Sequence, residues 1–224
     1  MPYMNEIKQP LILELPAFQQ ALLDPANELV DCRPAASFAD GFIPGALLIE
    51  PNDSFVNWAG LLLDKKKKPL LICEPGTEKA LTGLLQQAGL PAVAGFLGGG
   101  FPVWKAAGAP TDMIIVVEAD ELAMDLPHDE NLIVVDVRTE TEFTEGHVKD
   151  AVHLPLQEIT DPVLLGNIED RDNLYIHCSG LYRSVTAASF LKRQGFHNLR
   201  VVVGGWDAIK LQKIELVERK EKLN

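Results

Sequence analysis

The stretch LVDCRPAASFADGFIPGALLI (residues 29–49) returns later in the chain as VVDVRTETEFTEGHVKDAVHL (residues 134–154). At an offset of 105 residues, as from Asp31 to Asp136, the two stretches share an aspartate, an arginine, a phenylalanine, a glycine and an alanine. Further on, LLQQAGL before GGGFPVW corresponds to FLKRQGF before VGGWDAI. Because this self-similarity extends over nearly the whole chain, the sequence predicts two similar domains.

The boundary between the two predicted domains falls in KAAGAPTD (residues 105–112), where glycine, proline and small residues interrupt the pattern. The apolar run MIIVV then restarts it. We therefore expect one domain over residues 1–110 and a second over residues 113–224. The charged tail IELVERKEKLN is expected to be a surface helix or a frayed end.

Short apolar runs alternate with segments of helical period in each half of the chain. The runs include PLLIC in the first half and LIVVDV and NLYIHC in the second, and RSVTAASFLKRQG is one of the helical segments. Continuous apolar strands are typical of parallel sheets that are covered on both faces. The predicted fold class is therefore α/β, with a parallel sheet flanked by helices on both faces in each domain.

The composition argues against several functions. The formal net charge of -12 at pH 7 disfavours a nucleic-acid partner, because such partners usually meet a basic face. The start MPYMNEIKQP has no basic segment followed by a long apolar stretch, and no apolar run is long enough to span a bilayer. Three cysteines without a Cys-x-x-Cys pair fit a reducing compartment. We therefore expect a cytoplasmic protein with no membrane partner.

The second half has a cysteine, Cys178, at a position that favours catalysis. The run NLYIHC ends at Cys178, and SGLYRS leads into a helix expected to begin near Arg183 or Ser184. The cysteine thus lies at the carboxyl end of a parallel strand, where open α/β sheets gather ligands. Backbone N–H groups of the loop and the helix dipole favour an anion there, and cysteines so placed have a pKa of about 3.5–7.5 instead of about 8.5. Cys178 is therefore the candidate nucleophile.

Other residues near Cys178 have roles that the sequence leaves open. Gly180 is expected to supply the conformational freedom of a tight loop. Arg183 pairs either with an anionic substrate or with a carboxylate such as Asp136, which would brace the loop. Asp136 and Arg138 end a neighbouring strand, where a structural ion pair is preferred over substrate orientation. His177 should point to the face opposite Cys178, which favours a structural role.

Four segments of the second half resemble the rhodanese family of sulfurtransferases: HCSGLYRS at residues 177–184, DVR at 136–138, EGHVKDA from Glu145 and GGW at 204–206. The resemblance covers both halves and implies a tandem rhodanese. It implies that Cys178 takes sulfur from thiosulfate or a persulfide, holds it as a persulfide and passes it to a thiol, without a cofactor. A small-molecule or protein thiol can be the acceptor. The resemblance further implies that Arg183 acts with Cys178, that Asp136 and Arg138 support the site, and that the substrate-binding loop comprises Ser179, Gly180, Leu181, Tyr182 and Ser184.

More narrowly, GLYRSVTAASFLKRQGFHNL and GGWDAIK are similar to the rhodanese portion of bacterial fusions that carry a metal-dependent persulfide dioxygenase domain. The chain has no His-x-His-x-Asp-His run, and its five histidines are scattered. Neither a metal site nor dioxygenase activity is therefore expected.

The first half resembles a degenerate copy of the second. Its loop reads ICEPGTEKAL, in which Lys79 stands where Ser184 would be and no arginine closes the loop. Either Cys73 or Glu74 corresponds to Cys178, depending on the alignment. The carboxylates of Glu74 and Glu78 would repel a thiolate at Cys73, so we expect the first domain to be inactive.

Two other functions compete with sulfur transfer. Cysteine phosphatases place five residues between cysteine and arginine, whereas here four residues separate Cys178 from Arg183. The shorter loop suits a terminal sulfur better than a phosphoryl group. A non-catalytic regulatory or binding protein on the same fold is the second alternative, and the first half illustrates it.

Overall fold

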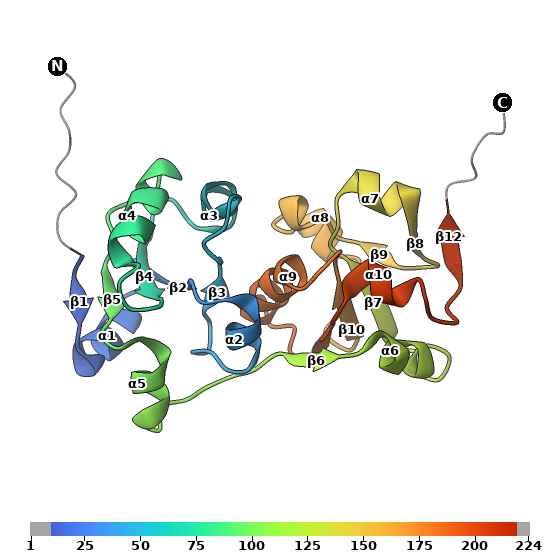
Figure 1. Cartoon of the computed structure of the whole chain (residues 1–224), viewed down its shortest axis with the longest axis horizontal. Helices are drawn as coiled ribbons and strands as arrows, with labels where there is room; N and C mark the ends of the chain where they lie inside the picture. The colour runs from blue at the N-terminus through green and yellow to red at the C-terminus, as the bar shows by residue number, and fades with distance from the viewer. Residues whose placement is uncertain (1–9, 219–224) are drawn as a thin grey trace, which may run out of the picture. The chain divides into compact units, whose positions relative to one another are not determined.

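The structure is a computed structural model that describes residues 10–218, and the chain divides after residue 113 into two compact units (Figure 1). The first unit contains β1 (Ile12–Leu13), α1 (Leu15–Leu22), β2 (Asn27–Asp31), α2 (Ala35–Ala39), β3 (Leu47–Leu48), α3 (Phe55–Leu62), β4 (Lys68–Ile72), α4 (Glu78–Gln87), β5 (Gly95–Leu97) and α5 (Gly100–Ala106).

The second unit repeats this order and adds to it. It contains β6 (Ile115–Val117), α6 (Ala119–Asp125), β7 (Leu132–Asp136), α7 (Glu140–Glu145), β8 (Gly146–Val148), β9 (Val152–His153), the 3-10 helix η1 (Leu156–Glu158), α8 (Pro162–Leu165), β10 (Asn173–His177), α9 (Tyr182–Arg193), β11 (Leu199–Val202), α10 (Gly205–Ile209) and β12 (Leu216–Glu218).

Each unit is built on one five-stranded sheet, and the two sheets have the same connectivity. The strand order is β1-β5-β4-β2-β3 in the first unit and β6-β11-β10-β7-β9 in the second. All neighbouring strands in both sheets are parallel. Helices lie on both faces of each sheet (Figure 1). The predicted α/β fold class is therefore confirmed.

Continuous apolar runs form the central strands because both of their faces are buried. In β4, Leu70, Leu71 and Ile72 are fully buried, and in β10 Leu174, Tyr175 and Ile176 are at most 2% exposed. A run without polar alternation has no side to turn toward water, so it fits only between two layers of helices. This burial is what the sequence pattern predicted for PLLIC and NLYIHC.

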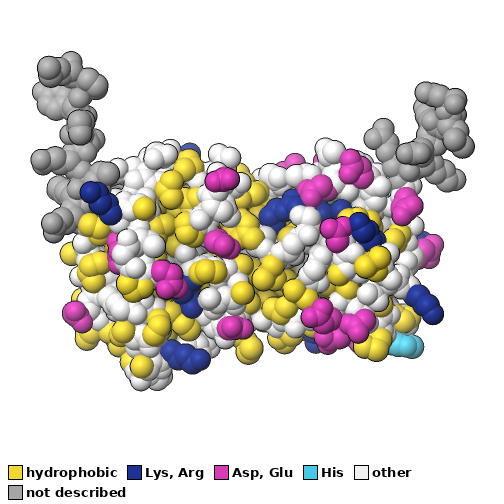
Figure 2. Space-filling view, in the orientation of Figure 1, with side chains coloured by type: hydrophobic (Ala, Val, Ile, Leu, Met, Phe, Trp, Pro, Cys, Tyr) yellow, Lys and Arg dark blue, Asp and Glu magenta, His cyan; other side chains and the backbone are white. Residues whose placement is uncertain are grey.

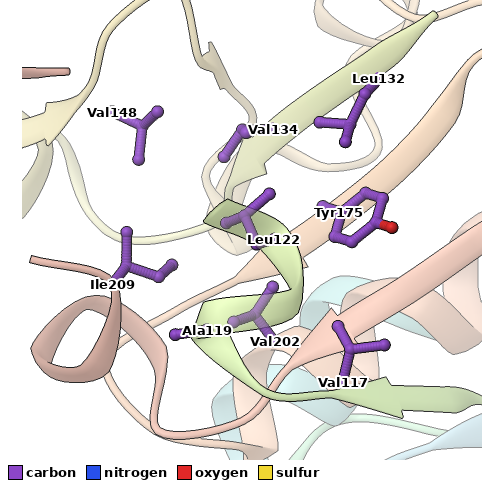
Figure 3. Packing of buried hydrophobic residues seen from close by; sticks show 9 residues of the cluster. All are labelled: Val117, Ala119, Leu122, Leu132, Val134, Val148, Tyr175, Val202 and Ile209. Atoms are coloured by element: carbon purple, nitrogen blue, oxygen red, sulfur yellow. The ribbon is translucent and has the colours of Figure 1, made fainter. Parts of the chain in front are cut away.

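A hydrophobic cluster covers one face of the second sheet (Figure 3). Leu122 of α6 lies against side chains of neighbouring strands, among them Val134 and Tyr175. Side chains alternate between the faces of a strand, so His177 lies on the same face as Tyr175. Cys178 points the other way, toward the side covered by α9, which packs on β10 and β11. The nine buried members of the cluster are Val117, Ala119, Leu122, Leu132, Val134, Val148, Tyr175, Val202 and Ile209.

The end of the chain differs from the prediction. Residues 216–218 of the charged tail form β12, which pairs antiparallel with β8 in a separate two-stranded sheet. The expected surface helix is therefore wrong for this part, because Leu216 packs against the hydrophobic cluster and Val217 pairs with His147. The rest of the tail, residues 219–224, lies outside the described residues.

Acidic side chains are spread over the visible face of both units (Figure 2), in agreement with the formal net charge of -12. No helix within residues 10–218 is long and apolar enough to cross a membrane. In the same part of the chain, no group of three or more histidine, cysteine, aspartate or glutamate side chains could hold a metal ion.

Candidate active site

Cys178 directly follows β10 at the carboxyl end of this central strand. A three-residue loop separates it from α9, which begins at Tyr182, one residue before the earliest start expected from the sequence. The cysteine is 1% exposed, so its sulfur lies beneath the loop at the start of a twelve-residue helix. The position at a strand end and a helix N-terminus is thus the one that the apolar run NLYIHC predicted.

Two polar groups approach the sulfur. The backbone N–H of Gly180 donates to Cys178 Sγ at 3.3 Å, and Ser184 Oγ lies 3.6 Å from the same atom. Ser184 Oγ accepts from the Cys178 thiol, and its own hydroxyl donates to the carbonyl of Leu181 at 2.8 Å, which ties the first turn of α9 to the loop. Partial positive charge from the N–H group and from the helix N-terminus is therefore directed at the sulfur.

The loop residues predicted to bind substrate differ in their exposure. Ser179 and Gly180 are exposed, Leu181 and Tyr182 are half-buried, and Ser184 is fully buried. The expectation that Gly180 supplies conformational freedom is wrong: its φ is not in the left-handed region, and a Cβ atom there would meet nothing within 4 Å. Gly180 contributes its N–H group instead.

Arg183 lies over the loop and is held by a carboxylate. Its Nη1 donates to Glu142 Oε2 at 2.7 Å and its Nη2 to Glu142 Oε1 at 2.8 Å. Nη2 also donates to Ser179 Oγ at 2.6 Å. The partner is therefore not Asp136, which the sequence offered as an example, because Asp136 is occupied by a different arginine. Glu142 is the site residue that the sequence reasoning missed, although the spacing Thr139-x-x-Glu142 is that of a capping box.

Asp136 and Arg138 form a buried ion pair beside the site. Arg138 Nη2 lies 2.6 Å from Asp136 Oδ2 and also donates to the carbonyl of Gly146 at 2.6 Å. The guanidinium carbon lies 4.5 Å from the centroid of the Trp206 ring. The guanidinium donors of Arg138 are taken by Asp136 and the Gly146 carbonyl, and its flat face is covered by Trp206. Arg138 therefore has the geometry of a structural residue.

The first unit contains the same ion pair in the same geometry. Arg33 Nη2 lies 2.6 Å from Asp31 Oδ2 and donates to the carbonyl of Gly41 at 2.8 Å. The Arg33 guanidinium lies over the Phe101 ring at 4.1 Å, as Arg138 lies over Trp206. This frame of aspartate, arginine and aromatic ring is therefore independent of the chemistry at Cys178.

His177 is fully buried on the side of the sheet where Trp206 lies, with ring centroids 6.4 Å apart. Its Nε2 is 3.6 Å from Asp136 Oδ2. Burial lowers the pKa of the imidazole, with the nearby Asp136 acting in the opposite direction. A neutral, buried ring facing away from the sulfur fits the structural role that the sequence favoured.

In the first unit, Cys73 rather than Glu74 corresponds to Cys178. Ile72 is the register partner of Asp31, as His177 is of Asp136, so the next residue occupies the cysteine position. The following loop is one residue longer, because α4 begins only at Glu78. Burial raises the pKa of the Cys73 thiol to about 11, and nearby carboxylates add to the effect.

Comparisons with known proteins relate the chain to one family. The model of the rhodanese-like domain matches it twice, over residues 15–107 and 118–212. A sulfurtransferase of Allochromatium vinosum is 29% identical over 93 residues, which are 42% of this chain and 85% of that protein. A thiosulfate sulfurtransferase of Pseudomonas putida is 33% identical over 87 residues, which are 39% of this chain and 77% of that protein. Among solved structures, the rhodanese-like domain of an Anabaena protein covers 50% of this chain and 85% of its own, with 22% identity and a TM-score of 0.44.

Proposed function

This chain belongs to the family of rhodanese-like domains, and from that premise we propose that it is a sulfurtransferase whose second unit carries the transferred sulfur as a persulfide on Cys178. Both relatives named above are sulfurtransferases, which supports the general activity. The observation that carries the finer proposal is the contact of Cys178 Sγ with the Gly180 N–H group at the start of α9. An anionic sulfur is the species that such a position stabilises.

In the first step, the Cys178 thiolate attacks the outer sulfur of the donor, and a new S–S bond forms. With thiosulfate, the old S–S bond breaks and its electron pair leaves on sulfite, so the enzyme gains one sulfur. With a persulfide RSSH, the electron pair leaves on the thiolate RS⁻. In either case one S–S bond forms as another breaks, so donor and enzyme together neither gain nor lose electrons and no redox cofactor is required.

In the second step, an acceptor thiolate attacks the outer sulfur of the protonated Cys178 persulfide, which takes its proton from the donor RSSH or, when the donor was thiosulfate, from water. The bond between the two sulfur atoms breaks, the Cys178 thiolate is regenerated and the acceptor leaves as its persulfide. The Gly180 N–H group is placed to receive the negative charge that returns to Cys178 Sγ. The acceptor in this proposal is a small-molecule or protein thiol in a reducing compartment such as the cytoplasm, where Cys178 stays free.

Phosphatase chemistry fits the site less well. A phosphoryl group carries several charged oxygens that a loop arginine has to bind. Here the Arg183 fork is bound by Glu142, and Ser179 takes a further donor of the same guanidinium. The first unit, with the raised pKa of Cys73 and no arginine in its loop, is proposed to be catalytically inactive.

Mass spectrometry of the intact protein tests the proposal. The purified protein is incubated with thiosulfate or with glutathione persulfide, in parallel with the variants Cys178→Ser and Cys73→Ser. We expect a gain of one sulfur atom that cyanide removes, present in the parent and in Cys73→Ser and absent from Cys178→Ser. No gain with either donor would reject sulfur transfer, and a gain that survives in Cys178→Ser would move the carrier to another cysteine.

A further inference from the structure

We infer that Glu142 is a positioning residue that compensates the charge of Arg183, and that it thereby disfavours sulfur donors whose leaving group is a dianion. The inference rests on the proposed function, because it concerns the selectivity of the same site. It assigns to Glu142 a role in how the site discriminates between thiosulfate, which releases sulfite, and persulfides of thiols, which release a monoanionic thiolate.

The contacts of Arg183 leave little of its charge for a donor. The guanidinium makes a bidentate pair with Glu142, at 2.7 and 2.8 Å, in the fork geometry that suits a carboxylate best. A third bond, at 2.6 Å, goes to the hydroxyl of Ser179 in the loop itself. The Arg183 side chain is only 19% exposed. Arg183 therefore fixes the loop while its charge is balanced from within the chain.

Glu142 is itself held in place. Its Oε2 accepts from the backbone N–H of Thr139 at 2.9 Å and from the Thr139 hydroxyl at 2.8 Å. These bonds belong to the capping box that begins α7, so the carboxylate is part of a helix terminus. Hydrogen bonding to Arg183 lowers the pKa of Glu142 to about 2. The carboxylate is therefore ionised at neutral pH.

A comparison of the two units shows whether the fold requires the Glu142 network. The ion pair of aspartate and arginine is present in both units with the same distances. In contrast, three of the four members of the Glu142 network have no counterpart in the first unit, because Thr139, Glu142 and Ser179 are matched by Pro34, Ser37 and Glu74 at the offset of 105 residues. Since the loop after Cys73 is one residue longer, Lys79, the second residue of α4, takes the place of Arg183, the second residue of α9, and Ser37 offers it no carboxylate. The fold thus forms without the network, so the network serves the site.

The pairing of Arg183 with Glu142 determines how much positive charge is available to stabilise the leaving group of the sulfur donor. Sulfite departs with two negative charges next to the breaking bond, whereas the thiolate of a persulfide donor departs with one. A carboxylate whose oxygens lie within 2.8 Å of the guanidinium nitrogens cancels most of the field that would stabilise the second charge. The other nearby arginine, Arg138, is compensated in the same way by Asp136.

The variant Glu142→Gln removes this charge and keeps a similar shape. The measurement is kcat/KM for thiosulfate and for 2-mercaptoethanol persulfide, with the same acceptor thiol. We expect the ratio of the two values to change about tenfold in favour of thiosulfate, the effect of one partly screened charge. The matched control is Glu145→Gln, on the same helix and exposed, which should leave the ratio unchanged.

The double variant Glu142→Gln/Arg183→Gln sharpens the test. The single variant Arg183→Gln leaves the carboxylate uncompensated and should shift the ratio against thiosulfate. In the double variant both charges are gone, so the ratio should return close to that of the parent. If instead both donors slow by the same factor in Glu142→Gln, or the double variant has the most altered ratio, the inference is wrong and Glu142 only stabilises the loop.

A binding measurement keeps the inference separate from the proposed function. In the Cys178→Ser background no sulfur can be carried on residue 178, and sulfite binding is followed by calorimetry. Sulfite should bind about tenfold more tightly when Glu142→Gln is added. Equal affinities would overturn the role of Glu142 even if sulfur transfer is established. Tighter binding would support it even if the parent transfers no sulfur.

Discussion

Gly205 approaches the carbonyl oxygen of Cys178 so closely that a Cβ atom on Gly205 would lie 2.2 Å from it. The backbone of Gly205 is also left-handed, with φ 54, and the next residue, Trp206, donates its N–H to the same carbonyl at 2.7 Å. The turn before α10 thus supports the peptide bond that follows the proposed sulfur carrier. Only glycine fits at this position.

The variant Gly205→Ala should therefore lower both stability and sulfur loading. Steric overlap with a buried backbone and strain at φ 54 together should cost about 3 kcal/mol of unfolding free energy, measured by urea titration. Gly180→Ala is the stability control, because a Cβ there meets no atom within 4 Å, and it should change the unfolding free energy by less than about 0.5 kcal/mol. Similar losses in the two variants would contradict this account.

The two cysteines that follow the central strands should differ in reactivity. At pH 8 a thiol with a pKa of about 11 is ionised in about one molecule in a thousand, so Cys73 should resist iodoacetamide. Cys178, whose sulfur meets an N–H group at a helix start, should be alkylated first. Peptide mapping after limited alkylation measures both. Rapid labelling of Cys73 in the Cys178→Ser variant would show that burial does not protect it.

The Glu142 carboxylate should make the free energy of unfolding depend on pH in the acid range. Its pKa in the folded protein is about 2, below the ordinary 4.5, so the unfolded chain binds the proton more readily. The contribution of Glu142 to the unfolding free energy is complete above pH 4.5 and is lost as the pH falls toward 2. After allowance for solvent screening, the loss should be about 1–2 kcal/mol. Denaturant titrations of the parent and of Glu142→Gln should diverge above pH 4.5 and converge near pH 2.

The buried ion pairs should matter for stability in both units. Replacing Arg138 by alanine leaves Asp136 buried without its charged partner, which typically costs about 3–5 kcal/mol. Arg33→Ala should cost the same in the first unit, where Asp31 is fully buried. Unfolding followed by circular dichroism gives both values. A loss confined to Arg138→Ala would show that the pair serves the site rather than the frame common to both units.

The fold was predictable because it depends on patterns that are local or repeated. Apolar runs such as NLYIHC have no polar face, and their repetition at a fixed offset indicated two sheets of the same kind. The one-residue uncertainty between Cys73 and Glu74 could not be removed in this way. It depends on the register of β4 against β2, which pairs Ile72 with Asp31 and is a tertiary contact.

The site was less predictable than the fold. Cys178 could be found from its place after a strand, but the partner of Arg183 lies 41 residues away in the sequence. A capping-box pattern predicts that Glu142 caps α7, and nothing in the pattern indicates which cation shares the carboxylate. β12 was missed for a related reason, because Leu216 and Val217 are flanked by charged residues and their pairing with β8 is not local.

The strand order of the second sheet also constrains how this unit can be made on a ribosome. β6 is the first strand of this unit to be synthesised, yet among the described strands it pairs with β11 alone, and β11 begins at Leu199. The turn that carries Gly205 follows later still. Because domains tend to fold as units during translation, the nascent second unit exposes an unpaired edge until almost all of it has emerged. Chains that stall or terminate before β11 should therefore keep this edge unpaired, which makes them targets of chaperones and proteases.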